Sequence, residues 1–179
     1  MLTYDVYVDG SFNGSNASWG FIVVENDKPI HSDKGVLFGQ INEMYQVGGE
    51  ITAAMKAIEW AKTNSCKINI FYDYLGIENW ATKQWKAKKK FTQEYQKFMQ
   101  DNKSYINSFK KVKSHSGNTY NEAVDQLAAS ATTNSISEVK ESPLIDKPSF
   151  GFIPTPKSKP TKEELISACE NLLNLLKKT

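Results

Sequence analysis

The stretch YDVYVDGSF (residues 4–12) alternates apolar and polar side chains up to an aspartate, which glycine and serine follow at once. A period of two predicts a half-buried strand, which we place at residues 4–9. KINIFYD (residues 67–73) reads as another strand that ends on an acid, Asp73. One carboxylate at a strand end has no special meaning, so a functional site requires that several acids converge on one point.

The other elements follow from changes in the hydrophobic period. Apolar residues recur at every second position in short runs and at every third or fourth position in longer ones, and turn-forming residues separate these runs. The predicted strands are residues 17–25, 34–39, 67–73 and 106–113, and the predicted helices are residues 48–64, 75–80, 91–102 and 118–131. Together with residues 4–9, this order predicts an α/β domain with a five-stranded mixed sheet flanked by helices.

The character of the chain changes after about Thr133. Five of the six prolines lie between Pro143 and Pro160, in a stretch with little periodicity that is typical of a linker or an extended arm. An amphipathic pattern then returns, opened by the capping sequence Thr161-x-x-Glu164. We expect a compact domain at residues 1–134, a proline-rich linker or arm at 135–160 and an amphipathic helix at 161–179.

Composition excludes several classes of protein. No apolar run reaches the ~20 residues that span a bilayer, and the first residues do not have the pattern of a signal peptide. The two cysteines, Cys66 and Cys169, are far apart and indicate neither a zinc site nor a disulfide framework. We therefore expect a cytoplasmic protein that does not contact membranes. We also expect a monomer, whose C-terminal helix could mediate self-association or a protein contact.

The charges are unevenly distributed along the chain. The net charge is only +2, but residues 83–113 carry ten lysines against two acids, Glu94 and Asp101. All 22 basic residues are lysine, which contacts phosphate as a point charge and lacks the bidentate fork with which arginine reads guanine. This region predicts binding to a nucleic-acid backbone without strong sequence specificity.

Four carboxylates stand out by their positions: Asp9, Glu50, Asp73 and Asp125. If the strands of Asp9 and Asp73 are parallel neighbours, both acids emerge at the edge where α/β sheets place their ligands. Such a cluster is tolerable only with bound cations, and oxygen ligands select hard ions such as Mg²⁺ or Mn²⁺. Taken singly, each acid is more typical of an ordinary surface position, so the case rests on the set.

Four blocks of sequence occur in order: VDGSF (8–12), GGEITAA (48–54), YDYLGIENW (72–80) and KVKSHSGNTYNEAVDQLA (111–128). In order and spacing they resemble the motif blocks of the type 1 ribonuclease H family, of the bacterial ribonuclease HI type, over residues 1–133. The resemblance implies a ribonuclease H-like fold. It also implies an endonuclease that hydrolyses the RNA strand of RNA/DNA hybrids and leaves 5′-phosphate and 3′-hydroxyl ends.

The resemblance also implies a catalytic site. Asp9, Glu50, Asp73 and Asp125 correspond to the family's metal-binding acids, with two Mg²⁺ ions as cofactor and Mn²⁺ able to substitute. By resemblance, Asp9 bridges both ions, Asp125 joins it at the ion that activates water, and Glu50 and Asp73 join it at the leaving group. His115 corresponds to a mobile histidine that acts near the leaving group and the product.

Substrate contacts are implied on two sides of this site. The family uses polar groups beside the first acid and before the glutamate to contact the minor groove, which suggests Ser11, Asn13 and Gln46. Small polar loop residues are also ordinary turn formers. The stretch NWATKQWKAKKKF (79–91) resembles the basic protrusion that holds the DNA strand. We expect its contacts from Trp85, Lys86, Lys88 and Lys89, whereas the alternative reading is that these lysines are a solvated surface.

Two other kinds of function are also compatible with parts of this sequence. A catalytically weak nucleic-acid-binding module of the same fold would also carry the basic region. Retention of all four acids argues against it, because an unneutralised cluster would be a liability in a pure binder. A transposase, integrase or exonuclease of the same architecture would differ in its final acid, and the NEAVDQLA block favours the ribonuclease.

Overall fold

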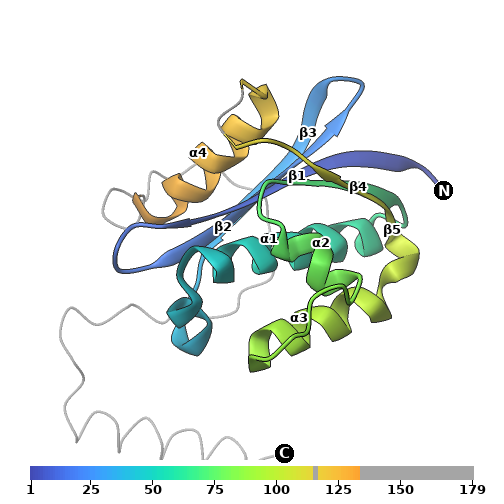
Figure 1. The fold of residues 1–179 in the computed structure, drawn as a ribbon. Coiled ribbons are helices and arrows are strands. Elements are labelled where there is room, and N and C mark those ends of the chain that lie inside the picture. The colour runs from blue at the N-terminus through green and yellow to red at the C-terminus, as the bar shows by residue number, and fades with distance from the viewer. Residues whose placement is uncertain (115–116, 134–179) are drawn as a thin grey trace, which may run out of the picture. The chain divides into compact units, whose positions relative to one another are not determined.

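The computed structural model describes residues 1–114 and 117–133. A five-stranded sheet forms the centre of this part, with α1, α2 and α3 on one face and α4 on the other (Figure 1). The strands follow the spatial order β3-β2-β1-β4-β5. The helices are α1 (Tyr45–Thr63), α2 (Gly76–Ala81), α3 (Lys90–Asp101) and α4 (Thr119–Thr133).

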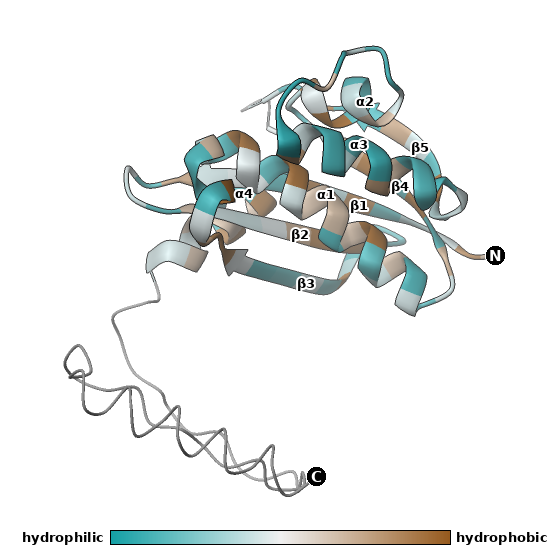
Figure 2. Ribbon diagram, turned by 90° about the horizontal axis from the view of Figure 1, so that it is seen from below, coloured by the Kyte–Doolittle hydropathy of each residue, from teal (hydrophilic) through white to brown (hydrophobic). Residues whose placement is uncertain are grey.

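The sheet combines an antiparallel meander with two parallel strands. The first three strands, β1 (Thr3–Phe12), β2 (Ala17–Glu25) and β3 (Lys28–Val36), pair antiparallel in sequence order. The other two, β4 (Lys67–Tyr72) and β5 (Ile106–Lys111), extend the sheet in parallel from β1. Figure 2 shows the edge strand β3 as largely hydrophilic beside the more apolar β2, as expected for a strand that has only one neighbour. The predicted five-stranded mixed sheet is confirmed.

The two faces of the sheet bury separate apolar clusters. The larger cluster lies under α1 and α3 and includes the fully buried side chains of Val6, Val8, Ile58 and Tyr95. The smaller one lies under α4 and is built around Tyr7, whose ring stacks on that of Phe71 with centroids 4.4 Å apart. The strand alternation therefore directs odd-numbered residues of β1 toward α4 and even-numbered residues toward α1.

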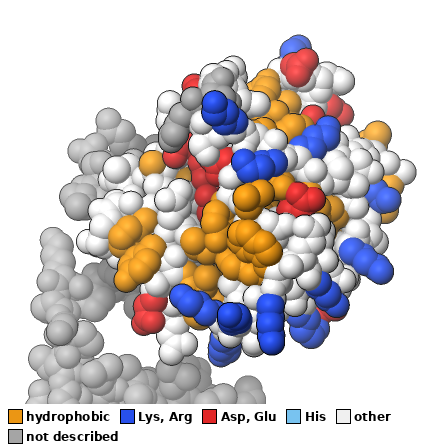
Figure 3. Space-filling view, viewed as in Figure 1, with side chains coloured by type: hydrophobic (Ala, Val, Ile, Leu, Met, Phe, Trp, Pro, Cys, Tyr) orange, Lys and Arg blue, Asp and Glu red, His pale blue; other side chains and the backbone are white. Residues whose placement is uncertain are grey.

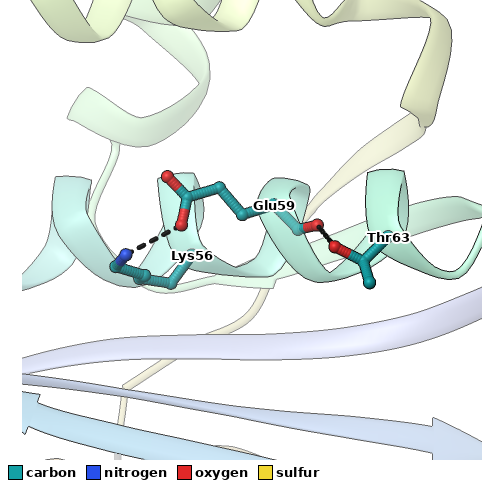
Figure 4. Close-up of polar contacts among 3 residues, drawn as sticks. All are labelled: Lys56, Glu59 and Thr63. Carbon is teal, nitrogen blue, oxygen red and sulfur yellow. Dashed lines mark hydrogen bonds and ion pairs between the residues drawn. The ribbon is translucent and has the colours of Figure 1, made fainter. Parts of the chain in front are cut away.

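Helix α1 has the amphipathic character that its sequence predicted. Its alanines and isoleucines face the sheet, and its exposed side carries an ion pair between Lys56 Nζ and Glu59 Oε2 at 2.8 Å (Figure 4). The Thr63 hydroxyl donates to the carbonyl oxygen of Glu59 at 3.0 Å near the C-terminal end. These contacts one turn apart stabilise the solvent face while the apolar face packs on the sheet.

Several boundaries differ from the sequence prediction. The third strand spans Lys28–Val36 and not residues 34–39, because Asn26 and Asp27 both adopt positive φ and form a tight two-residue hairpin turn. The edge position tolerates Pro29, which needs no ladder hydrogen bond there. Helix α1 begins at Tyr45, and a 3₁₀ helix that was not expected, η1 (Gly39–Met44), precedes it.

None of the helices in residues 1–114 and 117–133 has the length and apolar character needed to cross a membrane. The predicted linker at 135–160 and helix at 161–179 lie outside the described residues.

Candidate active site

Asp9 and Asp73 meet where β1 and β4 separate. The parallel register of these strands ends with the pair Tyr7 and Phe71, and each acid lies two positions further along the chain. β4 ends at Tyr72, whereas β1 continues to Phe12 in its pairing with β2. The expectation that β1 ends at Asp9 is therefore wrong, because its antiparallel neighbour β2 still pairs with it there. Only the parallel ladder stops before the acid.

Glu50 joins these acids because the backbone of helix α1 lies directly against the backbones of β1 and β2. A Cβ atom on Gly49 would lie 2.1 Å from the carbonyl oxygen of Ser18, and one on Gly10 would lie 2.3 Å from the amide nitrogen of Glu50. No side chain fits at either position, so the two glycines set the distance between helix and strand. As a result Glu50, which is only 2% exposed, lies beside Asp9. Sequence reasoning missed this role of the glycines, although Asp-Gly and Gly-Gly-Glu were the available signal.

The acids line one cavity of about 340 Å³. Carboxylate oxygens of Asp9, Glu50 and Asp73 lie within 4.8 Å of one another. Asp125 lies outside this group of three but lines the same cavity from α4. Helix α4 is held on the sheet by the hydroxyl of Ser18, which donates to the carbonyl oxygen of Ala128 at 2.7 Å. The structure thus brings the four predicted acids to one cavity from β1, α1, α4 and the turn after β4.

Burial and mutual repulsion make the ionised state of these acids costly. Burial, followed by the charge of Asp73, raises the pKa of Asp9 to about 7. Burial, followed by the charges of Asp9 and Asp73, raises the pKa of Glu50 well above its ordinary value. A hydrogen bond between the carboxyl groups of Glu50 and Asp9 favours the protonated form of Glu50, and the amide of Gly10 donates to Asp9 Oδ1 at 2.7 Å. A bound cation would remove most of this cost.

Two buried oxygen atoms at the cavity have no hydrogen-bond partner among the described residues. They are Glu50 Oε2 and Asn121 Oδ1, on side chains that are 2% and 4% exposed. Buried acceptors without partners are rare in folded proteins, and an ion or an ordered water is the usual explanation. An orphaned carboxylate oxygen beside two other carboxylates fits the ligand set of a hard divalent cation.

Several residues of this cavity were not predicted from the sequence. Gln46, Val47, Tyr74, Ser114, Asn121 and Glu122 complete its wall. Of these, only Gln46 had been singled out. The signal for Asn121 and Glu122 was their spacing from Asp125, since residues three or four apart share one face of a helix.

A second cavity, of about 370 Å³, adjoins the first and shares Val47 and Tyr74 with it. Three of the predicted substrate-binding lysines, Lys86, Lys88 and Lys89, line it together with Tyr45 and Trp80. Figure 3 shows acidic side chains in a hollow, an apolar patch next to them and lysines around that patch. The acidic cavity and the cationic surface are thus continuous.

Trp85 lies next to this second cavity. It is 40% exposed, and its ring packs edge-on against that of Trp80 with centroids 5.8 Å apart. Trp80 is half-buried and packs against the main core. Trp85 therefore presents an aromatic surface to solvent, and Trp80 packs between it and the main core.

The predicted minor-groove residues lie on β1, on the loop after it and at the start of α1. Gln46 lines the acidic cavity, and Ser11 pairs with Ser18 near the end of β1. Asn13 uses its Oδ1 to accept from the amides of Ser15 and Asn16 at 3.0 and 2.9 Å, so this oxygen shapes its own loop. His115 lies outside the described residues.

A mixed sheet with carboxylates gathered at one edge and lysines beside them defines the class of metal-dependent nucleases. Comparison with known proteins agrees with this class. A family model described as RNase H matches residues 3–133. The ribonuclease H of Hahella chejuensis is 31% identical over 144 residues, which cover 72% of this chain and 92% of that protein. The ribonuclease H of Pseudoalteromonas translucida is 33% identical over 144 residues, covering 72% and 89%.

Solved structures share the fold. The RNase H1 of Halobacterium salinarum superposes with a TM-score of 0.63 at 19% identity, covering 74% of this chain and 99% of that one. LC11-RNase H1 in complex with an RNA/DNA hybrid also gives 0.63, at 15% identity and coverage of 75% and 99%. This chain belongs to the ribonuclease H family. Enzymes of the family hydrolyse the RNA strand of RNA/DNA hybrids, so the predicted family, fold and activity are confirmed.

Proposed function

We propose that this chain carries out the ribonuclease H reaction in the cavity lined by Asp9, Glu50, Asp73 and Asp125. We further propose that these acids hold two Mg²⁺ ions, which Mn²⁺ can replace. The observation that carries this proposal is the approach of three carboxylates to within 4.8 Å, two of them buried. Without a cation this arrangement combines desolvation with repulsion and gains nothing in return.

The ligand chemistry supports a hard divalent ion. The four acids offer oxygen atoms only, which suits magnesium and manganese better than zinc or copper. The unpartnered Oε2 of Glu50 would become a ligand and so would be satisfied. The pKa values of Asp9 and Glu50, raised by burial, would fall again beside a cation, so both groups would bind as carboxylates.

The residues around the cavity have separate tasks in this proposal. Asp9, Glu50, Asp73 and Asp125 would hold two divalent ions, which would supply activation of the attacking water and neutralisation of charge on the departing 3′-oxygen. The amide of Gly10 fixes the carboxylate of Asp9 through its 2.7 Å hydrogen bond, and the close packing of α1 excludes water from the side of Glu50. Asp125 completes the wall from α4. His115 is proposed to assist departure of the leaving group or of the product.

The substrate would lie across both cavities. We propose that Trp85, Lys86, Lys88 and Lys89 hold the phosphates and sugars of the DNA strand, while Ser11, Asn13 and Gln46 contact the minor groove. The hybrid-bound structure of LC11-RNase H1 supports a hybrid as a ligand of this fold. Lysines and an exposed aromatic ring suit backbone contact that does not depend on sequence. The domain boundaries, cytoplasmic location and monomeric state stay predictions from the sequence.

The test is a comparison of Asp9→Asn with the unaltered chain on labelled RNA/DNA hybrid, double-stranded RNA, double-stranded DNA and single strands, with and without Mg²⁺. We expect only the hybrid to be cut, only with the metal ion, and about 10³-fold more slowly by Asp9→Asn. Hybrid binding should change little, because lysines make most phosphate contacts. Asp101→Asn, on the outer face of α3 and paired with Lys97, is the matched control. Full activity of Asp9→Asn would overturn the assignment of the site.

A further inference from the structure

Asn42 connects two segments that the proposed function places against the substrate. It lies in η1, and its side-chain Oδ1 accepts from the amide of Ala17 at 2.6 Å. Its Nδ2 group donates to the carbonyl oxygen of Ser15 at 3.1 Å. The amide nitrogen of this half-buried side chain is therefore bonded to the loop between β1 and β2, and its oxygen to Ala17, the first residue of β2.

Within residues 1–114 and 117–133, the other hydrogen bonds of the loop at residues 13–16 are internal to it. Asn13 accepts from two amides within it, and the amide of Asn13 donates to the carbonyl oxygen of Asn16 at 3.2 Å. Within this loop, the backbone of Gly14 adopts a positive φ of 93°. Among the hydrogen bonds of the described residues, the bond from Asn42 to Ser15 is the only one that links residues 13–16 to a part of the chain outside the β1–β2 hairpin.

The backbone of Asn42 reaches the other segment. Its carbonyl oxygen accepts from the amide of Tyr45, which has a positive φ of 53° at the junction between η1 and α1. Gln46 follows directly and lines the acidic cavity. The ring of Tyr45 also packs edge-on against Phe12, with centroids 4.9 Å apart, at the other end of the hairpin connection. Asn42 thus links the loop of Asn13 to the start of α1.

We propose that Asn42 is a positioning residue that sets the distance between the Asn13 loop and Gln46, so that both reach the same groove of the hybrid. This inference rests on the proposed substrate roles of Asn13 and Gln46. A short loop with a glycine loses backbone freedom when it binds, and this loss weakens affinity. Because Asn42 already holds the loop in the free protein, most of this backbone freedom is lost during folding and not on binding.

The experiment measures KM, kcat and Tm for Asn42→Ala on RNA/DNA hybrid at saturating Mg²⁺. Loss of two partly exposed hydrogen bonds should raise KM about tenfold, with kcat within about twofold of the unaltered chain. Asn64→Ala is the control, because Asn64 Nδ2 makes a similar bond, to the carbonyl oxygen of Trp60 at 2.8 Å, at the far end of α1. It should leave KM unchanged.

A second variant controls for the case in which Asn42→Ala does not fold. Asn42→Asp keeps the acceptor for Ala17 but loses the donor to Ser15, so it should fold and show a smaller increase in KM. That increase should persist when the salt concentration is raised, since simple repulsion of phosphate by the new charge would be screened.

Combining Asn42→Ala with Gln46→Ala distinguishes an error in the inference about Asn42 from an error in the proposed substrate contacts. If Asn42 acts by positioning, the effects of Asn42→Ala and Gln46→Ala on KM should be clearly non-additive. If Gln46→Ala raises KM and Asn42→Ala does not, whatever happens to Tm, the inference about Asn42 is wrong and the proposed substrate contacts stand. If Gln46→Ala leaves KM unchanged, the substrate assignment fails and the inference fails with it.

Discussion

Asp9 and Asp73 each lie two positions beyond Tyr7 and Phe71, the last parallel pair of β1 and β4. The two carboxylates therefore face each other where the ladder opens, and α1 adds Glu50 from the other face of the sheet. A strand pair without an acidic site would gain stability from apolar residues at these positions. The acids at these positions therefore destabilise the metal-free protein. This destabilisation can be measured as a lower free energy of unfolding.

Stability without divalent ions should depend on pH through Asp9. Its pKa is about 7 in the folded protein, whereas an unfolded aspartate titrates near its ordinary value of ~4. The folded state therefore binds the proton more tightly, so this contribution is complete below about pH 4 and is lost as pH rises through about 7. In EDTA, the free energy of unfolding should fall between pH 5 and 8 by on the order of 2 to 4 kcal/mol.

Thermal unfolding of the unaltered chain and Asp9→Asn across this pH range provides the measurement. The variant should lose the part of the decline that comes from Asp9 and keep the part that comes from burial of Glu50, so its curve should be shallower. It should be the more stable protein at pH 8, although it is far less active. Mg²⁺ should restore stability to the unaltered chain and much less to the variant. Parallel curves for the two proteins would contradict the assigned environment of Asp9.

Gly49→Ala should disrupt the close packing of α1 on β1 and β2. The added Cβ would lie 2.1 Å from the backbone oxygen of Ser18, and neither backbone can yield without moving the helix. We expect a loss of about 3 kcal/mol in the free energy of unfolding, together with reduced activity as Glu50 moves. Gly14→Ala serves as a comparison, because its Cβ would meet open space and only its positive φ is strained, for about 1 kcal/mol. Equal losses in the two variants, measured by denaturant unfolding, would contradict this account.

The lysines of the second cavity should contribute to affinity and not to chemistry. The triple variant Lys86→Gln, Lys88→Gln and Lys89→Gln should raise KM for hybrid and leave kcat within about threefold. Binding measured at several salt concentrations should lose about one unit of logarithmic slope for each phosphate contact removed. The control replaces Lys28, Lys56 and Lys62, which line neither of the two substrate cavities. Identical slopes for both triple variants would assign the cavity lysines to the solvated surface.

His115→Ala should lower kcat by about 10- to 100-fold, as expected for a group that assists proton transfer or product release without holding metal. The Mg²⁺ concentration needed for half-maximal activity should stay within about twofold of that of the unaltered chain. His31→Ala is the matched control, since His31 lies on β3, stacked on Trp60 and remote from the acids. Inactivation of His115→Ala as complete as that of Asp9→Asn would contradict this role.

The sequence by itself determined which segments become strands and helices and which residues could form a site. Alternation predicted β1 and β2, the 3.6-residue period predicted α1 and α4, and four motif blocks in order predicted the family that the comparisons confirmed. These features are encoded within short stretches, because propensity, period and capping depend on residues less than about three turns apart. The four acids could therefore be named before their positions in space were known.

Only the tertiary structure decided how these residues meet. β1 passes through Asp9 because β2 pairs with it there, and β3 starts at Lys28 because two consecutive residues before it adopt positive φ. The distance of Glu50 from Asp9 depends on two glycines 39 positions apart in the sequence, Gly10 and Gly49. No pattern around Asn42 indicates its role, since its partners lie 25 and 27 residues away. Register, helix-to-sheet distance and loop anchoring all arise from contacts between remote segments, and no local pattern in the sequence specifies which segments will touch.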